Sequence, residues 1–357
     1  MPSSLPRASL VCKRWRRLVS DPGFLRRFRA RHRRNAPLLG FFTQGSSGAT
    51  FTPTLEPPDR LPRGRFSLKL DDGCRILNCR HGLVLIVDRT RLQVLVWDPI
   101  TGDLSRVAFP PGFGDGGTAV VNHGAVLRAA SDVQGGEDHS IHFLVALVGN
   151  DVAATRAFAC VYSSVTGVWS NLISTACPSM VPMYFPSTLV GGSLYWLLGW
   201  HSVGILEFDL DKQSLAVIDV PPGMLDYSLG HHCVTPAVGG GLGFTCLSGY
   251  NAKLWTRKTD CNGVARWVLG RSIELDKLLS LNREEGFPPM VFGFAEEDNM
   301  SFLATNIGIF MVQLESMQFK KPFEMLNLDA YHPFASIYTA GLGIDGGRDG
   351  GDLLHNT

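Results

Sequence analysis

The sequence has 357 residues, of which 45% are apolar, with 39 glycines and 21 prolines spread along its length. This composition can bury a large core, and the dispersed glycines and prolines predict many short elements joined by turns rather than a disordered chain. No stretch reaches the roughly 18 consecutive apolar residues of a membrane span, and the first 20 residues lack the apolar core of a signal peptide, so neither a membrane-spanning nor a secreted protein is expected.

Charge divides the chain into two parts. Residues 1–34 contain 11 Lys and Arg and one acidic residue, whereas the rest contains 22 basic and 31 acidic residues. The formal net charge of +1 therefore combines +10 in the first part with −9 in the second. We predict a boundary near Pro37, with a basic helical domain over residues 1–34, a main domain over 37–345 and a flexible tail over 346–357.

Two short helices are predicted in the basic part. Residues 8–19 place five apolar side chains on one helical face: Leu10, Val11, Trp15, Leu18 and Val19. Asp21 is expected to cap a second helix, and Pro22 suits its first position, where no N–H is needed. Helices of this length bury little by themselves, so we expect them to pack on a partner or on the rest of the chain.

The arginines of this region are interpreted as a solvated helix face. A nucleic-acid-binding arm is an alternative, but no aromatic residues are interleaved for base stacking, so nucleic acid is not the expected partner. A mitochondrial transit peptide is a second alternative, because the segment is Arg-rich and poor in acids. Trp15 and the capped second helix favour folded structure instead.

From Pro37 onward the apolar residues follow the period of strands. One unit recurs, in which a short apolar strand, a polar turn and another strand follow each other, at Val94–Pro110, Ala157–Ile173, Gly204–Pro221, Lys253–Ile273 and Gly308–Met325. Aligned positions in the middle copies are 46 and 47 residues apart, which is the period of propeller blades. The longer spacings contain the segments 111–139, predicted to be loop-like, and 273–289, predicted to hold a short helix.

A small sheet cannot cover both of its own faces, and radial stacking of such sheets does so. Strands at Leu38–Phe42 and Ala335–Thr339 could close the ring from opposite ends of the chain. We therefore predict a mainly β fold, a kelch-like β-propeller of six blades, with five to seven compatible with the pattern. A pair of β-sandwiches is the alternative architecture.

No motif predicts catalysis, a metal or a cofactor. The eight cysteines show no Cys-x-x-Cys spacing, so we expect reduced thiols. Adjacent His231 and His232 would point to opposite faces of a strand, which disfavours shared metal binding. The acidic groups Glu284-Glu285 and Glu296-Glu297-Asp298 could serve a propeller glycosidase, the enzymatic alternative, but both fall in predicted turns where carboxylates are solvated.

Residues Leu5–Phe24, with the run Val-Cys-Lys-Arg-Trp followed by Ser-Asp-Pro-x-Phe, resemble the second half of an F-box. The main domain is similar to the F-box-associated propeller of plant F-box proteins, for example at Val96–Gly102 and Gly293–Asp298. The resemblance implies a non-catalytic, intracellular protein of the cytoplasm, the nucleus or both. Its F-box would dock a Skp-family adaptor of an SCF-type cullin–RING ubiquitin ligase, and its propeller would bind an unidentified substrate protein.

The resemblance also implies which residues serve docking. Six side chains would belong to the F-box core or its adaptor-binding surface: Leu5, Pro6, Leu10, Val11, Trp15 and Leu18. The family pattern begins with a further helix that precedes the first residues of this sequence, so we expect weakened adaptor binding. A propeller-fold binding protein that no longer docks the adaptor is the alternative. Substrate contacts are expected on loops at one face, with 111–139 and 273–289 as candidates.

Overall fold

The structure, a computed structural model, describes residues 12–21, 23–24, 36–45, 48–56, 60–62, 66–114, 119–129, 142–183, 185, 187–199, 203–224, 230–237, 239–323 and 331–336. Its elements are helices α2 (Lys13–Ser20) and α4 (Leu275–Leu279) and strands that form six antiparallel sheets. Contacts divide the chain into two compact units, one of residues 1–108, 126–141 and 332–357 and the other of residues 109–125 and 142–331.

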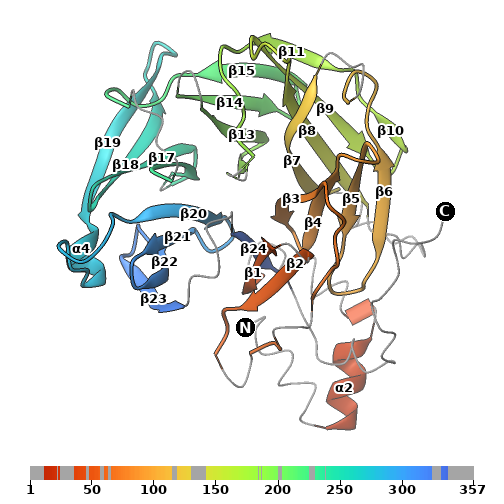
Figure 1. Ribbon diagram of the computed structural model, residues 1–357, viewed down its shortest axis with the longest axis horizontal. Helices are drawn as coiled ribbons and strands as arrows, with labels where there is room; N and C mark the ends of the chain where they lie inside the picture. The colour runs from red at the N-terminus through yellow and green to blue at the C-terminus, as the bar shows by residue number, and fades with distance from the viewer. Residues whose placement is uncertain are drawn as a thin grey trace. The chain divides into compact units, whose positions relative to one another are not determined.

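The first unit holds two sheets (Figure 1). The first sheet contains β1 (Leu38–Gly45), β2 (Gly48–Pro53) and β24 (His332–Ala335). The second sheet contains β3 (Cys74–Arg80), β4 (Leu83–Asp88), β5 (Gln93–Trp97) and β6 (Leu104–Ala108). In the second sheet β4 is buried at every position, whereas only Val107 is buried in the outer strand β6.

Strand β7 (Val120–Arg128) runs from the second unit into the first and belongs to the third sheet. The other strands of that sheet are β8 (Phe143–Asn150), β9 (Arg156–Ser163), β10 (Val168–Trp169) and β11 (Ile173–Ala176). The fourth sheet contains β12 (Thr188–Val190), β13 (Ser193–Leu198), β14 (Gly204–Asp209) and β15 (Ser214–Ile218). The fifth contains β16 (His232–Pro236), β17 (Leu242–Ser248), β18 (Asn251–Thr259) and β19 (Ala265–Glu274), and the sixth β20 (Met290–Ala295), β21 (Met300–Thr305), β22 (Gly308–Gln313) and β23 (Gln318–Phe323).

The five predicted hairpins are confirmed as β5–β6, β9–β10, β14–β15, β18–β19 and β22–β23. Successive strands are neighbours in these sheets, except that β11 pairs with β9 in the third sheet. The predicted pairing of the two chain ends is also confirmed, since Leu38 pairs with Ala335 and Phe42 with His332. The second of these strands is β24, which lies earlier in the chain than the predicted segment, whose residues 337–339 fall outside the described residues.

An aromatic cluster joins the first and second sheets. The ring of Phe42 lies 5.4 Å from that of Phe51, 5.6 Å from that of Trp97 and 5.3 Å from that of Phe334. Phe42 and Phe51 are fully buried, and their neighbours are nearly so. This packing of aromatic rings at 5–6 Å holds β24 against strands nearly 300 residues earlier in the chain.

The prediction that residues 111–139 form a loop is wrong over Val120–Arg128, which is strand β7. Asn122, His123 and Gly124 look like turn residues in the sequence but are buried in that strand, with the Asn122 amide donating to Asn150 Oδ1 at 2.8 Å. Neighbouring Gly149 permits the close approach, because a Cβ there would lie 2.1 Å from the Val120 carbonyl oxygen. Mutual hydrogen bonding makes this polar strand tolerable in the core.

Two general expectations can be compared with the structure. No helix among the described residues is long and apolar enough to cross a membrane. All eight cysteines are free thiols in the structure.

Candidate functional site

Helix α2 exposes two large apolar side chains, Trp15 and Leu18. Trp15 is 48% exposed and Leu18 is 47% exposed, although both lie on the predicted apolar face. The basic residues Lys13, Arg14 and Arg17 are exposed as well. An eight-residue helix with an uncovered tryptophan is marginal by itself, so the exposed face is suited to packing against a partner.

The turn after α2 is ordered by Asp21, as the sequence predicts. The backbone N–H of Asp21 donates to the Leu18 carbonyl at 3.2 Å, which closes the helix. The Asp21 carboxylate accepts the backbone N–H of Phe24 at 2.6 Å, where Gly23 and Phe24 begin the next helical turn. An aspartate in this position satisfies an otherwise unpaired N–H and fixes the direction in which the chain leaves α2.

The remaining candidate docking residues Leu5, Pro6, Leu10 and Val11 lie outside the described residues, as does most of the second predicted helix. The structure therefore brings together Trp15 and Leu18 alone of the six, on successive turns of one helix. Their roles in docking stay a prediction.

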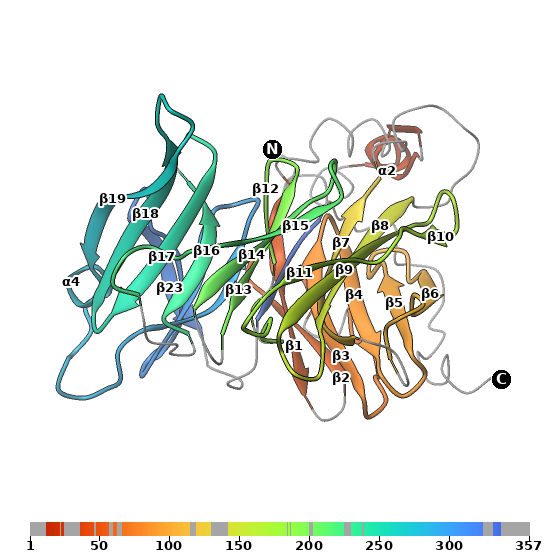
Figure 2. The ribbon, with the colours of Figure 1, turned by 90° about the horizontal axis from the view of Figure 1, so that it is seen from above.

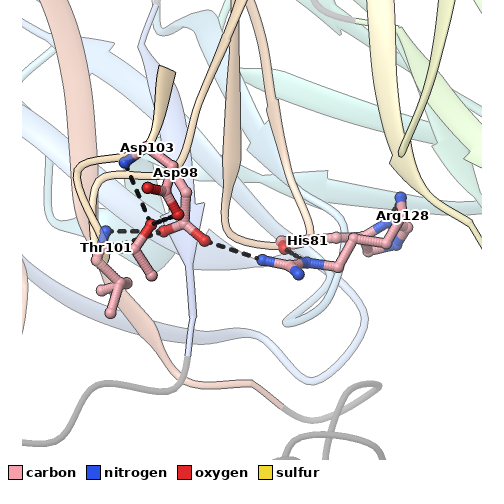
Figure 3. A network of polar contacts seen from close by, with 6 residues as sticks. His81, Asp98, Thr101, Asp103 and Arg128 are labelled. Carbon is pink, nitrogen blue, oxygen red and sulfur yellow. Dashed lines mark hydrogen bonds and ion pairs between the residues drawn. The ribbon is translucent and has the colours of Figure 1, made fainter. Parts of the chain in front are cut away.

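In the second sheet, Asp98 organises the turn between β5 and β6 (Figure 3). Its carboxylate accepts the backbone N–H of Ile100 at 2.8 Å and of Thr101 at 3.3 Å, and Nη2 of Arg128 lies 3.2 Å away. Arg128 Nε in turn donates to the carbonyl oxygen of His81 at 2.8 Å. The Trp-Asp dipeptide is thus a structural turn, in which a buried carboxylate is fully engaged.

Other hairpin turns repeat this device. Carboxylates at four further turns accept backbone N–H groups a few residues ahead: Asp88, Asp151, Asp209 and Asp260. Aspartate suits such turns because its short side chain bonds its own backbone two or three residues on. The excess of acidic residues in the main domain is therefore explained in part by turn structure, a regularity that sequence analysis missed.

The acidic groups considered for glycosidase chemistry also lie in turns, as predicted. Glu284 and Glu285 are exposed, and Glu296 Oε1 accepts the backbone N–H of Leu189 at 2.8 Å. One end strand of each sheet was compared for acidic residues, and none of the six contains Asp or Glu: β3, β7, β12, β16, β20 and β24. A pair of opposed carboxylates, which glycoside hydrolysis requires, is thus not found on these strands.

The cysteines, and the histidines that the structure describes, differ in burial. Burial raises the pKa of the Cys160 and Cys233 thiols to about 12 and that of Cys74 to about 11, with the Asp88 charge adding to the effect at Cys74. A thiol is nucleophilic as its thiolate, so these groups are unreactive near neutral pH. His232 is buried whereas His231 is half-buried, and the described residues contain no group of three or more His, Cys, Asp or Glu placed to hold a metal.

The comparison with family models decides what this arrangement belongs to. Residues 75–340 match the model described as "F-box protein AT5G49610-like, beta-propeller", and residues 1–27 match the F-box domain. The chain belongs to the AT5G49610-like F-box propeller family. The fold is accordingly a six-bladed β-propeller preceded by a short F-box region, and its six sheets are the blades.

Other comparisons add little to this family assignment. No curated protein matches the sequence. Among solved structures, the nidogen/laminin complex aligns at 11% identity and TM-score 0.43, over 82% of this chain and 95% of that one. Saccharomyces cerevisiae Sqt1 aligns at 11% identity and TM-score 0.41, over 83% and 74%.

Helix α2 and the capped turn at Asp21 lie within the F-box match of this propeller protein. The propeller match begins at β3 and so excludes β1 and β2, although β1 pairs with β24 inside it. Membership in the family therefore places the exposed Trp15 and Leu18 in the domain by which F-box proteins are defined.

Proposed function

We propose that this F-box propeller protein is a non-catalytic substrate receptor of an SCF-type cullin–RING ubiquitin ligase. Its F-box docks a Skp-family adaptor, and its propeller binds the protein to be ubiquitinated. The observation that carries the proposal is the half-exposed pair Trp15 and Leu18 on α2, within the F-box match. Tryptophan is the residue type most enriched among binding hot spots, since its burial removes a large apolar area from water.

Several features support a non-catalytic role. The buried thiols of Cys160 and Cys233 have raised pKa values, and carboxylates in turns accept hydrogen bonds from backbone N–H groups. The free cysteines fit a reducing compartment, and we place the protein in the cytoplasm, the nucleus or both. The six predicted docking residues and the domain limits 1–34, 37–345 and 346–357 are part of the same proposal.

The segment 273–289 remains a candidate substrate contact. Leu275 and Leu279 of helix α4 are buried, and they anchor the segment to the fifth and sixth sheets. Beyond the helix, Phe287 and the pair Glu284-Glu285 are exposed. A segment fixed at one end with an exposed aromatic residue at the other is typical of a binding loop on a rigid scaffold.

The test is direct titration of the full chain with a purified Skp-family adaptor by calorimetry. We expect binding, with a loss of at least about tenfold in the double variant Trp15→Ala/Leu18→Ala, because both side chains lose their apolar contact area. Val152→Ala is the matched control, because it removes an apolar side chain that is 91% exposed in a blade turn.

If the adaptor does not bind, or binds the double variant as well as the control, the ligase role is wrong. The protein would then be a propeller-fold binding protein that does not dock the adaptor.

A further inference from the structure

Strand β19 differs from the outer strands of the other sheets. It has ten residues, eight of them exposed, whereas the outer strands β6 and β15 have five each. Natural edge strands are usually short, covered or interrupted, because a long exposed edge invites another strand to pair with it. The length and exposure of β19 therefore call for a functional reason.

The outer edge of β19 has no strand beside it among those that the structure describes. Within the described residues β19 pairs with β18 alone. The pairing runs from Asn251 opposite Glu274 to Thr259 opposite Ala265. No other backbone hydrogen bond between described residues reaches residues 265–274. Backbone N–H and C=O groups on that side consequently face outward. Such a row of donors and acceptors is the feature that strand addition uses.

The end of the β18–β19 hairpin is also clear of its own sheet. Strand β17 pairs with β18 only as far as Thr256. Strands β18 and β19 continue to pair beyond that point, from Arg257 opposite Trp267 to the turn. Figure 2 shows this hairpin extending past the neighbouring β17. An incoming segment can therefore reach both the edge and the flanking side chains.

Two anchors hold β19 in place while its edge stays exposed. Trp267 Nε1 donates to the Asp219 carbonyl at 2.7 Å, and its ring packs edge-on against Phe244 at 5.9 Å. Arg271 Nη1 donates to the Glu315 carbonyl at 2.8 Å on the other face. A strand that is fixed before binding loses little conformational entropy when a partner pairs with it.

The side chains along this edge are basic and apolar. The hairpin 251–274 carries five basic and two acidic residues, in a main domain whose net charge is −9. Successive side chains of a strand point to opposite faces of the sheet. With the register shift in this pairing, Arg266, Val268 and Arg271 lie on one face of the sheet, and Trp267 and Leu269 lie on the other. Val268 is 42% and Leu269 47% exposed.

We infer that the outer edge of β19 binds an extended segment of a partner protein as an added strand, in which acidic side chains alternate with apolar ones. This inference rests on the proposed function and names the class of substrate segment. Acidic residues of the added strand would face Arg266 and Arg271, and apolar ones would cover Leu269. A second copy of this chain is disfavoured, because it would set one basic edge against another.

The test uses fluorescein-labelled ten-residue peptides that alternate Glu with Val, titrated with the full chain and followed by fluorescence anisotropy. The expected result is saturable binding that weakens with salt, and at least a tenfold loss in Arg266→Glu/Arg271→Glu. Arg266→Glu alone should lose several-fold; it removes only a 3.8 Å contact with Asp260 and so keeps the fold. Arg106→Glu on the outer strand β6 is the control and should change affinity less than twofold.

Strand addition is separated from simple charge attraction by N-methylated peptides. Methyl groups on the alternate amides that face β19 should abolish binding, whereas methylation of the other set should leave it intact. On binding, hydrogen exchange of the amides in residues 265–274 should slow.

Equal binding of both methylated peptides, no binding of any Glu-Val peptide, or self-association lost in the charge-reversal variant would overturn the inference. Because no adaptor is present, this failure is distinct from a failure of adaptor docking.

Discussion

The first sheet and helix α2 both carry aromatic side chains, which are buried in the sheet and half exposed in the helix. Phe42 and Phe51 are fully buried among rings supplied by the second sheet and by β24, whereas Trp15 and Leu18 are about half exposed. Large apolar side chains thus stabilise the core of the sheets, whereas Trp15 and Leu18 of α2 remain accessible. The difference supports the proposal that a partner packs against α2.

The largest loss of stability is expected when a ring is removed from the aromatic cluster. Phe42→Ala should lower the free energy of unfolding by about 3–5 kcal/mol, because it leaves a cavity among rings that cannot collapse to fill it. Urea unfolding followed by tryptophan fluorescence measures the change. Phe319→Ala, at a side chain 44% exposed on the outer strand β23, should cost under about 1 kcal/mol; similar costs at both sites would contradict this account of the core.

Asp98→Ala should have the next largest effect, since it leaves Arg128 and two backbone N–H groups without their acceptor. We expect a loss of about 2–3 kcal/mol in the same unfolding measurement. Asp98→Asn keeps an oxygen for the turn but not the charge opposite Arg128, and should cost roughly half as much. A change within 0.5 kcal/mol, about the level of a neutral surface site, would show that the turn does not depend on this carboxylate.

Much of the propeller follows from the sequence because hairpins are local. The pairs β5–β6 and β14–β15 carry their turn residues between two apolar runs, and Pro37 marks the change of period. Strand β7 could not be predicted in this way, since Asn122 and His123 read as turn residues until Asn150 supplies a hydrogen-bond partner 28 residues away. The exposed edge of β19 could not be predicted, because a strand with both faces exposed to solvent shows no alternation of apolar and polar residues.

A smaller effect depends on pH and concerns Asp88. Burial alone would raise the pKa of Asp88, but hydrogen bonds from Gln93 and Arg91 outweigh it, and the pKa lies below its usual value. A carboxyl with a lowered folded pKa contributes stability above the unfolded value of about 3.9, and this contribution is lost as pH falls through the folded pKa. Asp88→Asn should therefore destabilise by about 1–2 kcal/mol at pH 7 and progressively less below about pH 4.

Denaturation curves of both proteins between pH 7 and pH 2 check this sign. A difference that grows as the pH falls would contradict it.

The smallest effect on stability is expected at the cap that follows α2. Asp21→Ala removes the acceptor of the Phe24 N–H and should cost about 1 kcal/mol locally. Hydrogen exchange at residues 13–24 should quicken while the unfolding of the sheets is unchanged, and adaptor affinity should fall several-fold. Asp21→Ser retains a capping oxygen and should restore both, whereas slower exchange in the alanine variant would refute the role of the cap.

The central claim is that the adaptor docks on α2 and not on the sheets. It is tested most directly by measuring the free energy of unfolding and the adaptor affinity on the same preparations of Trp15→Ala/Leu18→Ala and the wild type. The account predicts unfolding free energies within about 0.5 kcal/mol of each other and an affinity at least about tenfold weaker in the variant. A large loss of stability with unchanged affinity would contradict it.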